Sequence, residues 1–418
     1  MSERDEKLPP RTVEPNRAQL RLLPVDLDRM LPDEHPARAV WDWVERLDLG
    51  QFYDVIRARE GSAGRPANDP KIYLALWIYA TLDGVGSARE IERLTRDHLA
   101  YQWICGGVSV NHHSLSDFRN AAADRLKDLL RQSVVTLMTS GLVEIRRVSH
   151  DGMKVRASAG AGSFHTRGKL EKIAQQQVER LSAEIEDDSA PASRREKSAR
   201  ERADKQRSRR IERALEEMKE AEKRKKSNNG KKKTEARTST TDPSARVMKM
   251  ADGGFRPAHN VHLVTDTATT VIVAVDVNND GTDLHAMVPL AEQIEQTYDR
   301  KPKEWLADGG CTSLGNIDAM AERGCKLYAP LRKRTNPNYE PTDERPTDSD
   351  AVREWRARMG TDEAKALYRQ RGATAEWVNA QLRAQGLWRF LVRGIEKARA
   401  VVLMHALTHN MRRSWSIA

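Results

Sequence analysis

Apolar residues recur at helical spacing over the first third of the chain, from Leu27 to about Gly141. Capping signals predict three helices within this stretch: one opening at Asn68-Asp69-Pro70, one after the capping box Ser87-Ala88-Arg89-Glu90, and one from about Ser114 through Leu137. Gly141 is expected to end the third helix. The pattern predicts an all-helical domain over residues 25–141. The polar, proline-containing residues 1–24 are expected to form a flexible arm.

The pattern then changes to short strands rich in β-branched residues, separated by helical stretches. Strands are predicted within residues 143–157, 262–265, 271–275, 305–307 and 326–330, with helices over about 283–298 and 314–323. Residues 332–350 are expected to form a loop, and residues 351–418 helices with a turn near Gly386. This order predicts an α/β domain with a mixed sheet, built from residues 142–164 and 245–418.

A strongly charged segment, residues 165–244, separates the first predicted strand from the others. Residues 167–237 hold 23 Lys/Arg and 15 Asp/Glu, a net charge of +8, and include long runs of helix-forming residues. We expect a long charged helix or a helical hairpin inserted into the α/β domain. A DNA-contacting role and a solvated spacer are equally compatible with this composition.

The composition of the whole chain favours an anionic partner. The 418 residues carry a formal net charge of +10, which biases the protein toward DNA, RNA or anionic membrane surfaces. Three widely spaced cysteines without a CxxC pair support neither a zinc ribbon nor a disulfide framework. The charged N-terminus lacks a signal peptide, and the longest apolar run is far short of the ~20 residues that span a bilayer. We therefore expect no membrane association and a cytoplasmic location on the nucleoid.

Two aspartates precede glycine at predicted strand positions, in Asp151-Gly152 and Asp308-Gly309. Ligands of open α/β sheets gather at strand ends, and glycine lets a substrate or metal approach closely. A third carboxylate, Glu376, lies in a predicted helix with Arg383 seven residues later, on the same face. Mg²⁺ and Mn²⁺ prefer such oxygen ligands, and a pair of ions ~4 Å apart serves phosphoryl transfer.

Several stretches in this order resemble the DDE transposases of bacterial insertion sequences, in the branch with an N-terminal helical domain. Asp151-Gly-Met-Lys154 is similar to the strand of the family's first aspartate, and Ala307-Asp308-Gly-Gly-Cys311-Thr-Ser313 to that of its second. Tyr368, Arg371, Glu376 and Arg383 match its Tyr-Arg-Glu signature. The stretches 84–90, 111–119 and 256–261 also resemble that branch. Met153, Cys311 and Arg383 stand where the family usually has Thr, Tyr and Lys.

The resemblance implies an RNase H-like catalytic domain with a helical basic insertion. It implies that Asp151, Asp308 and Glu376 bind two Mg²⁺ or Mn²⁺ ions and cut DNA at the transposon ends. Strand transfer into target DNA would follow, and a homodimer is expected on the paired ends. The helical N-terminal domain would recognise the terminal inverted repeats. Contacts to DNA are assigned to residues in the matching stretches: Tyr368, Arg371, Arg383, Arg119 and Lys154.

Two other classes of function remain open at this point: a catalytically inactive, transposase-derived DNA-binding protein, and an RNase H-fold nuclease without strand transfer. Among the remaining candidates, we expect Asp283 to cap the helix that follows it rather than to bind a metal. His112 and His113, being adjacent, point to different faces of a helix, which favours a structural or DNA-contacting role over a metal site.

Overall fold

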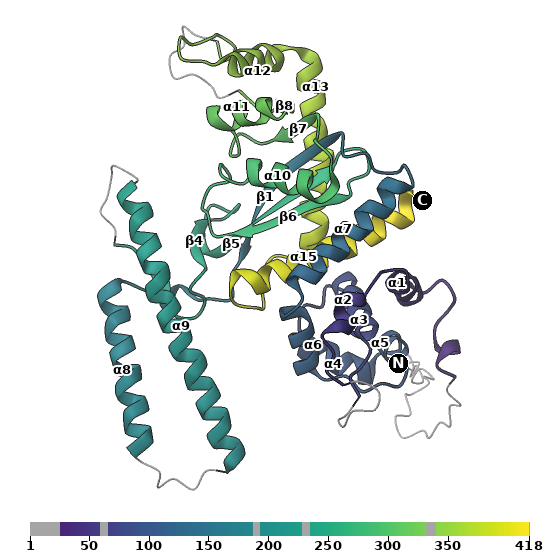
Figure 1. The fold of residues 1–418 in the computed structure, drawn as a ribbon, viewed down its shortest axis with the longest axis vertical. Helices are drawn as coiled ribbons and strands as arrows, with labels where there is room; N and C mark the ends of the chain where they lie inside the picture. Colours follow the sequence, from purple (N-terminus) through teal and green to yellow (C-terminus); the bar gives the residue numbers. More distant parts are fainter. Residues whose placement is uncertain (1–25, 59–65, 187–192, 228–234, 332–339, 418) are drawn as a thin grey trace, which may run out of the picture.

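The computed structural model describes residues 26–58, 66–186, 193–227, 235–331 and 340–417. The arm predicted for residues 1–24 lies outside these ranges. Figure 1 shows three parts: a helical N-terminal part, a sheet with helices on both faces, and a long helical hairpin that projects from the sheet. The predicted fold class is confirmed: the structure is a mixed α/β fold with a helical N-terminal region.

Within the described residues, seven α-helices precede the sheet. They are α1 (Pro36–Glu45), α2 (Gly50–Asp54), α3 (Pro70–Leu82), α4 (Ala88–Asp97), α5 (Leu99–Cys105), α6 (His112–Asn120) and α7 (Ala123–Thr139). The predicted caps are present, since Asp69 accepts from the backbone of Lys71 and Ser87 from that of Glu90.

The prediction of one helix from Ser114 through Leu137 is wrong, because the chain breaks it into α6 and α7. The backbone leaves helical geometry at Ala121 and Ala122. The break lets Leu115 of α6 and Leu126 of α7 both enter the same core.

The sheet mixes antiparallel and parallel pairing. Its strands are β1 (Arg147–Arg156), β4 (Arg246–Lys249), β5 (Phe255–Asp266), β6 (Ile272–Asn278), β7 (Glu304–Ala307) and β8 (Lys326–Tyr328). The order is β4-β5-β1-β7-β8, with β6 also paired to β5. β1 runs antiparallel to β5 and parallel to β7, and β7 runs parallel to β8. β1 is therefore the central strand, and its residues from Val148 to His150 are buried.

Helices cover both faces of this sheet. They are α10 (Met287–Tyr298), α11 (Leu314–Glu322), α12 (Asp350–Gly360), α13 (Asp362–Arg371), the π-helical η3 (Gly372–Glu376), α14 (Trp377–Ala384) and α15 (Ile395–Ile417). The last helix joins the two ends of the chain, because it packs against α7, α3 and β6. Its Asn410 side chain bonds both backbone groups of Ile272 at the start of β6. The N-terminal helices and one face of the sheet therefore share a single core.

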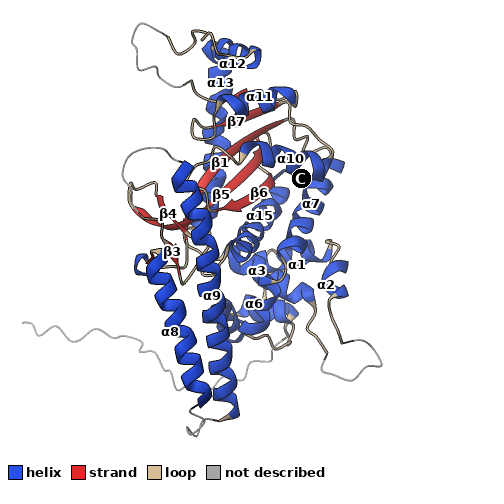
Figure 2. Cartoon of the chain, turned by 60° about the vertical axis from the view of Figure 1, so that its left-hand side comes forward, coloured by secondary structure: helices blue, strands red, loops and turns tan. Residues whose placement is uncertain are grey.

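The charged segment forms a helical hairpin, as the sequence predicts. Its helices are α8 (Arg167–Glu186) and α9 (Arg194–Ser227), and they lie side by side in Figure 2. The short strands β2 (Phe164–His165) and β3 (Thr238–Ser239) pair at its base. A small apolar cluster that includes Leu170 and Met218 holds the helices together. None of the described helices is long and apolar enough to cross a membrane.

Buried histidines make the stability of this fold depend on pH. Burial, with further repulsion from His262, lowers the pKa of His150 to about 3, and burial lowers that of His405 to about 3 and of His409 to about 4. An unfolded chain binds protons on these histidines near their ordinary pKa of 6.5, whereas the folded protein does not. The contribution of these histidines to the free energy of unfolding is therefore fully present above about pH 6.5. It is lost as the pH falls toward the lowered pKa values.

We expect the free energy of unfolding to fall by up to about 1.4 kcal/mol per pH unit for each buried histidine below about pH 6.5. Melting temperatures measured between pH 7.5 and 5 should show the decline. The variant His405→Gln should show a shallower decline, whereas the exposed His285→Gln control should behave like the wild type. Equal pH slopes for all three proteins would contradict this explanation.

Candidate active site

Asp151 and Asp308 lie side by side because of the parallel pairing between β1 and β7. The ladder pairs His150 with Ala307, so each aspartate occupies the next position beyond it. Neighbouring strands lie ~4.8 Å apart, which brings the two carboxylates close together. The backbone of Cys311 donates to Asp308 Oδ1 at 3.0 Å. This contact orients the second carboxylate.

Glu376 reaches the same place from the π-helical turn η3. Five residues separate it from Arg371, a spacing that points to different faces of an α-helix. A π-helix closes i→i+5 hydrogen bonds instead, and this geometry places the two side chains together. The sequence predicts a regular helix through this region, and that prediction is wrong. Short π-helical insertions occur frequently at functional sites.

The three predicted carboxylates converge on the guanidinium of Arg371. Its Nη1 donates to Glu376 Oε1, and its Nη2 lies 3.2 Å from Asp151 Oδ1 and 3.8 Å from Asp308 Oδ2. Arg371 is buried, with 8% of its surface exposed. Asn379 of α14 adds a hydrogen bond of 2.7 Å to Asp151 Oδ2. The site is thus arranged to hold positive charge between three acids.

The pKa values reflect this crowding. Burial raises the pKa of Asp151, as do the nearby charges of Asp308 and Glu376, while Arg371 opposes the rise. Burial acts to lower the pKa of Arg371, but the surrounding acids raise it above its ordinary value. A group that carries more positive charge than one guanidinium would favour the ionised form of Asp151 still more strongly.

Asp283 joins the site as a fourth carboxylate, and the prediction that it caps a helix is wrong. Helix α10 begins at Met287 without a side-chain cap. Lys154 and Asn260 instead donate to Asp283 Oδ1, at 2.8 and 2.6 Å. These bonds hold the pKa of Asp283 below its usual value, although burial alone would raise it. A Cβ at position 152 would lie 2.8 Å from this carboxylate, so only glycine fits there.

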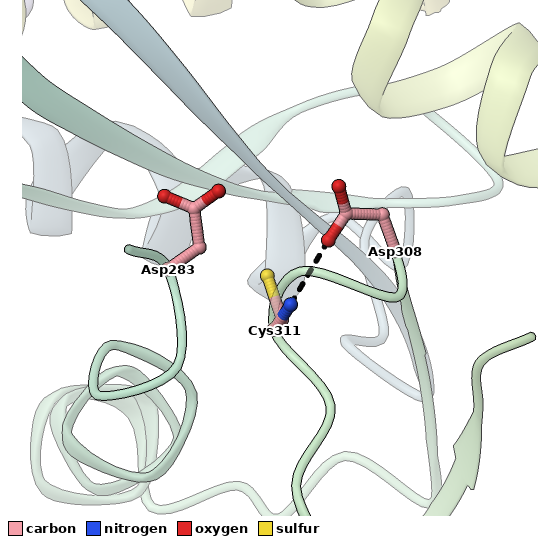
Figure 3. A group of neighbouring side chains, drawn as sticks. All are labelled: Asp283, Asp308 and Cys311. Carbon is pink, nitrogen blue, oxygen red and sulfur yellow. Dashed lines mark hydrogen bonds between the residues drawn. The ribbon is translucent and has the colours of Figure 1, made fainter. Parts of the chain in front are cut away.

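Asp283, Asp308 and Cys311 form a compact group, drawn in Figure 3. Their potential ligand atoms lie within 4.8 Å of one another, and among the described residues this is the one such group. The predicted triad is more widely spaced because Arg371 lies between its members. Burial and the neighbouring acids raise the pKa of the Cys311 thiol far above its ordinary value. The thiol is therefore protonated at neutral pH.

Of the residues predicted to contact DNA, some lie near the carboxylates and one lies in the helical part. Tyr368 lies half-buried on α13 near the carboxylates, and burial raises its pKa. Arg383 lies against β1, with Nε 3.2 Å from Met153 Sδ. Lys154 is held by Asp283. Arg119 lies elsewhere, buried in the helical part with its guanidinium 3.9 Å from the centre of the Trp77 ring. Its Nη1 donates to the backbone carbonyl of Gly86 at 3.1 Å.

The residues present fit a divalent cation. Carboxylate oxygens from four acids face one region, and hard oxygen ligands suit Mg²⁺ and Mn²⁺. The position between three of them already holds a cationic side chain, that of Arg371. Asp283 Oδ2 accepts no hydrogen bond from a described residue and faces the Gly310 side of the Asp308 loop.

The fold and the site together define an RNase H-like domain with a carboxylate centre. Residues 233–411 match the family model of the Transposase DDE domain, and residues 25–121 match that of the Transposase domain (DUF772). Neither the curated proteins nor the solved structures give a match. These two matches are consistent with a DDE transposase of an insertion sequence, a DNA-acting and metal-dependent class. Asp308 and Glu376 lie inside the first match, whereas Asp151 and the hairpin lie between the two.

Removing the positive charge of Arg371 should destabilise the protein, and a bound divalent ion should restore part of that stability. In EDTA, Arg371→Gln is expected to lower the free energy of unfolding by about 2–3 kcal/mol, since it leaves several acids facing one another. Mg²⁺ should then raise the melting temperature of this variant more than that of the wild type. Arg323→Gln, which removes a surface ion pair with Glu292 and Glu295, is the control. Equal increases of melting temperature by Mg²⁺ in the wild type and both variants would contradict this explanation.

The role of Asp283 can be tested by direct titration. We expect Asp283→Asn to weaken Mn²⁺ binding by roughly tenfold or more in isothermal titration calorimetry, because it removes a charged oxygen that faces Asp308. The control Asp299→Asn changes an exposed carboxylate at the C-terminus of α10, where the left-handed backbone suits asparagine. If Mn²⁺ affinity is unchanged and the melting temperature falls, Asp283 does not bind the metal and instead stabilises the fold through its ion pair with Lys154.

Proposed function

We propose that this transposase hydrolyses phosphodiester bonds at the ends of its element and then joins the freed strands to target DNA. The convergence of Asp151, Asp308 and Glu376 from three separate elements on a single cation supports this proposal. The carboxylates would hold two divalent ions, Mg²⁺ or Mn²⁺. When bound, such ions activate the attacking oxygen and stabilise the leaving oxygen.

In the first step, a water oxygen forms a bond to phosphorus, and the bond from phosphorus to the 3′-oxygen breaks. The products are a 3′-hydroxyl and a 5′-phosphate. In the second step, this 3′-hydroxyl attacks a phosphorus of the target and releases a target 3′-hydroxyl. Both steps exchange one oxygen for another at phosphorus, so one carboxylate centre can serve both.

The side chains around the carboxylates would position the reacting strand. Asn379 holds the carboxylate of Asp151 in place, and Lys154 does so for Asp283. We assign Tyr368 and Arg383, which flank the site, to contacts with phosphates near the cut. Arg371 would balance the charge of the acids and reach a phosphate as the ions bind. Two element ends must be processed together, and we therefore propose a homodimer on DNA.

The proposal is tested by cutting of a labelled duplex that carries the DNA flanking this gene. In Mg²⁺ or Mn²⁺, the wild type should cut at the element end and leave a 3′-hydroxyl. Asp308→Ala should lower the cutting rate by at least about a hundredfold, since it removes a ligand of the reacting centre. Asp299→Asn should cut like the wild type.

Each other outcome points to a different class of protein. Tight binding without cutting by the wild type would identify an inactive DNA-binding protein. Cutting without transfer to a second, unlabelled duplex would identify a nuclease.

A further inference from the structure

A cleft of about 910 Å³ lies between three parts of the molecule. One wall comes from α4 and α6 of the helical part, another from α9 of the hairpin, and a third from the segment that leads into α15. Figure 1 shows the hairpin and the N-terminal helices on opposite sides of the start of α15. No single part of the chain could form this cleft alone.

The cleft is lined by cations from all three walls. They are Arg89, Arg119, Arg209, Arg210, Arg213, Arg393 and Lys397. No aspartate or glutamate is among the described residues that line it. None of these seven cations forms a salt bridge with a described carboxylate. Burial, with the charges of Arg393 and Arg207, lowers the pKa of Arg210. The like charges are thus close enough to repel one another across the cleft.

Some cations elsewhere on the hairpin have acidic partners. Arg167 pairs with Glu222, Lys223 with Glu220, and Arg224 with Asp280. In the cleft, by contrast, Arg209, Arg210 and Arg213 of α9 lie together without a described acidic partner. Gathered and unpaired positive charge raises the free energy of the isolated protein, and a polyanion that enters the cleft would relieve the repulsion.

The cleft also has a defined relation to the carboxylates. Ser158, which lines it, follows Asp151 by seven residues along the direction of β1. At ~3.3–3.6 Å per residue the two positions are at most about 25 Å apart. Phosphates along one DNA strand are spaced by about 3.4 Å along the helix axis, so the cleft lies within about seven base pairs of the carboxylates.

We propose that this cleft binds the phosphate backbone of duplex DNA within about seven base pairs of the scissile bond. The inference rests on the proposed function for the position of the cut and extends it to the hairpin, whose cations become DNA ligands. The helical part, the hairpin and α15 would grip the duplex together. Binding there would be sensitive to salt and largely indifferent to base sequence, since backbone contacts carry no sequence information.

The test is a salt series of affinities for the duplex with the flanking DNA, measured by fluorescence anisotropy in EDTA. The cleft variant is Arg209→Ala/Arg213→Ala/Arg393→Ala. The control variant removes the same charge from three exposed lysines outside the cleft: Lys219→Ala/Lys249→Ala/Lys326→Ala. The cleft variant should lower the slope of log affinity against log salt by about 2–3 and weaken binding at least tenfold. The control should change the slope by less than 1.

Replacement of the same three arginines by lysine separates charge from folding. The lysine variant should keep the wild-type slope, because it keeps the charges. Ethylation interference should show phosphates within about seven base pairs of the cut for the wild type and the control, and fewer of them for the cleft variant. Equal slopes and equal interference in the cleft and control variants would overturn the proposal.

The two proposals fail in different ways. If the wild type binds through the cleft but does not cut, the cleft stands as a DNA site and the proposed reaction fails. If the cleft variant binds and cuts as the wild type does, the reaction stands and the cleft proposal is overturned.

Discussion

The parallel pairing of β1 with β7 is the constraint on which the carboxylate site depends. Its register pairs His150 with Ala307 and so carries Asp151 and Asp308 to adjacent positions at the end of the ladder. A shift of one residue would move one aspartate to the other face of the sheet. The antiparallel pairing of β1 with β5 sets Lys154 opposite Asn260, and both hold Asp283. One central strand thus places most of the site.

Charge balance governs the rest of the site. Three acids from β1, the end of β7 and η3 surround a buried guanidinium, and a fourth is held by Lys154. Removing water from like charges is costly unless opposite charge is near. Arg371 meets this requirement in the protein by itself, and the proposed divalent ions would meet it during the reaction. The π-helical turn is the local deviation that brings Arg371 and Glu376 onto one face.

The two ends of the chain are not independent. Helix α15 packs against α7 and α3, and Asn410 ties it to β6, so the helical part and the sheet share one core. The hairpin is anchored by pairs such as Arg224 with Asp280 of the segment after β6. A common scaffold of this kind keeps the walls of the basic cleft at a constant position relative to the carboxylates. Such a scaffold suits a protein that must hold a duplex and present one of its bonds to a metal site.

The sequence by itself determined the local features. Caps at Asp69 and Ser87, the strands from Val148 onward and the charged hairpin follow from residue patterns within a few turns or strands, where local physics is strong. The family resemblance supplied the three acids. Only the tertiary structure decided the placement of Asp283, the packing of Arg119 on Trp77, the break between α6 and α7, and the basic cleft beside α9. Each of these depends on contacts between residues far apart in the chain, and no periodicity in the sequence encodes which distant surfaces meet.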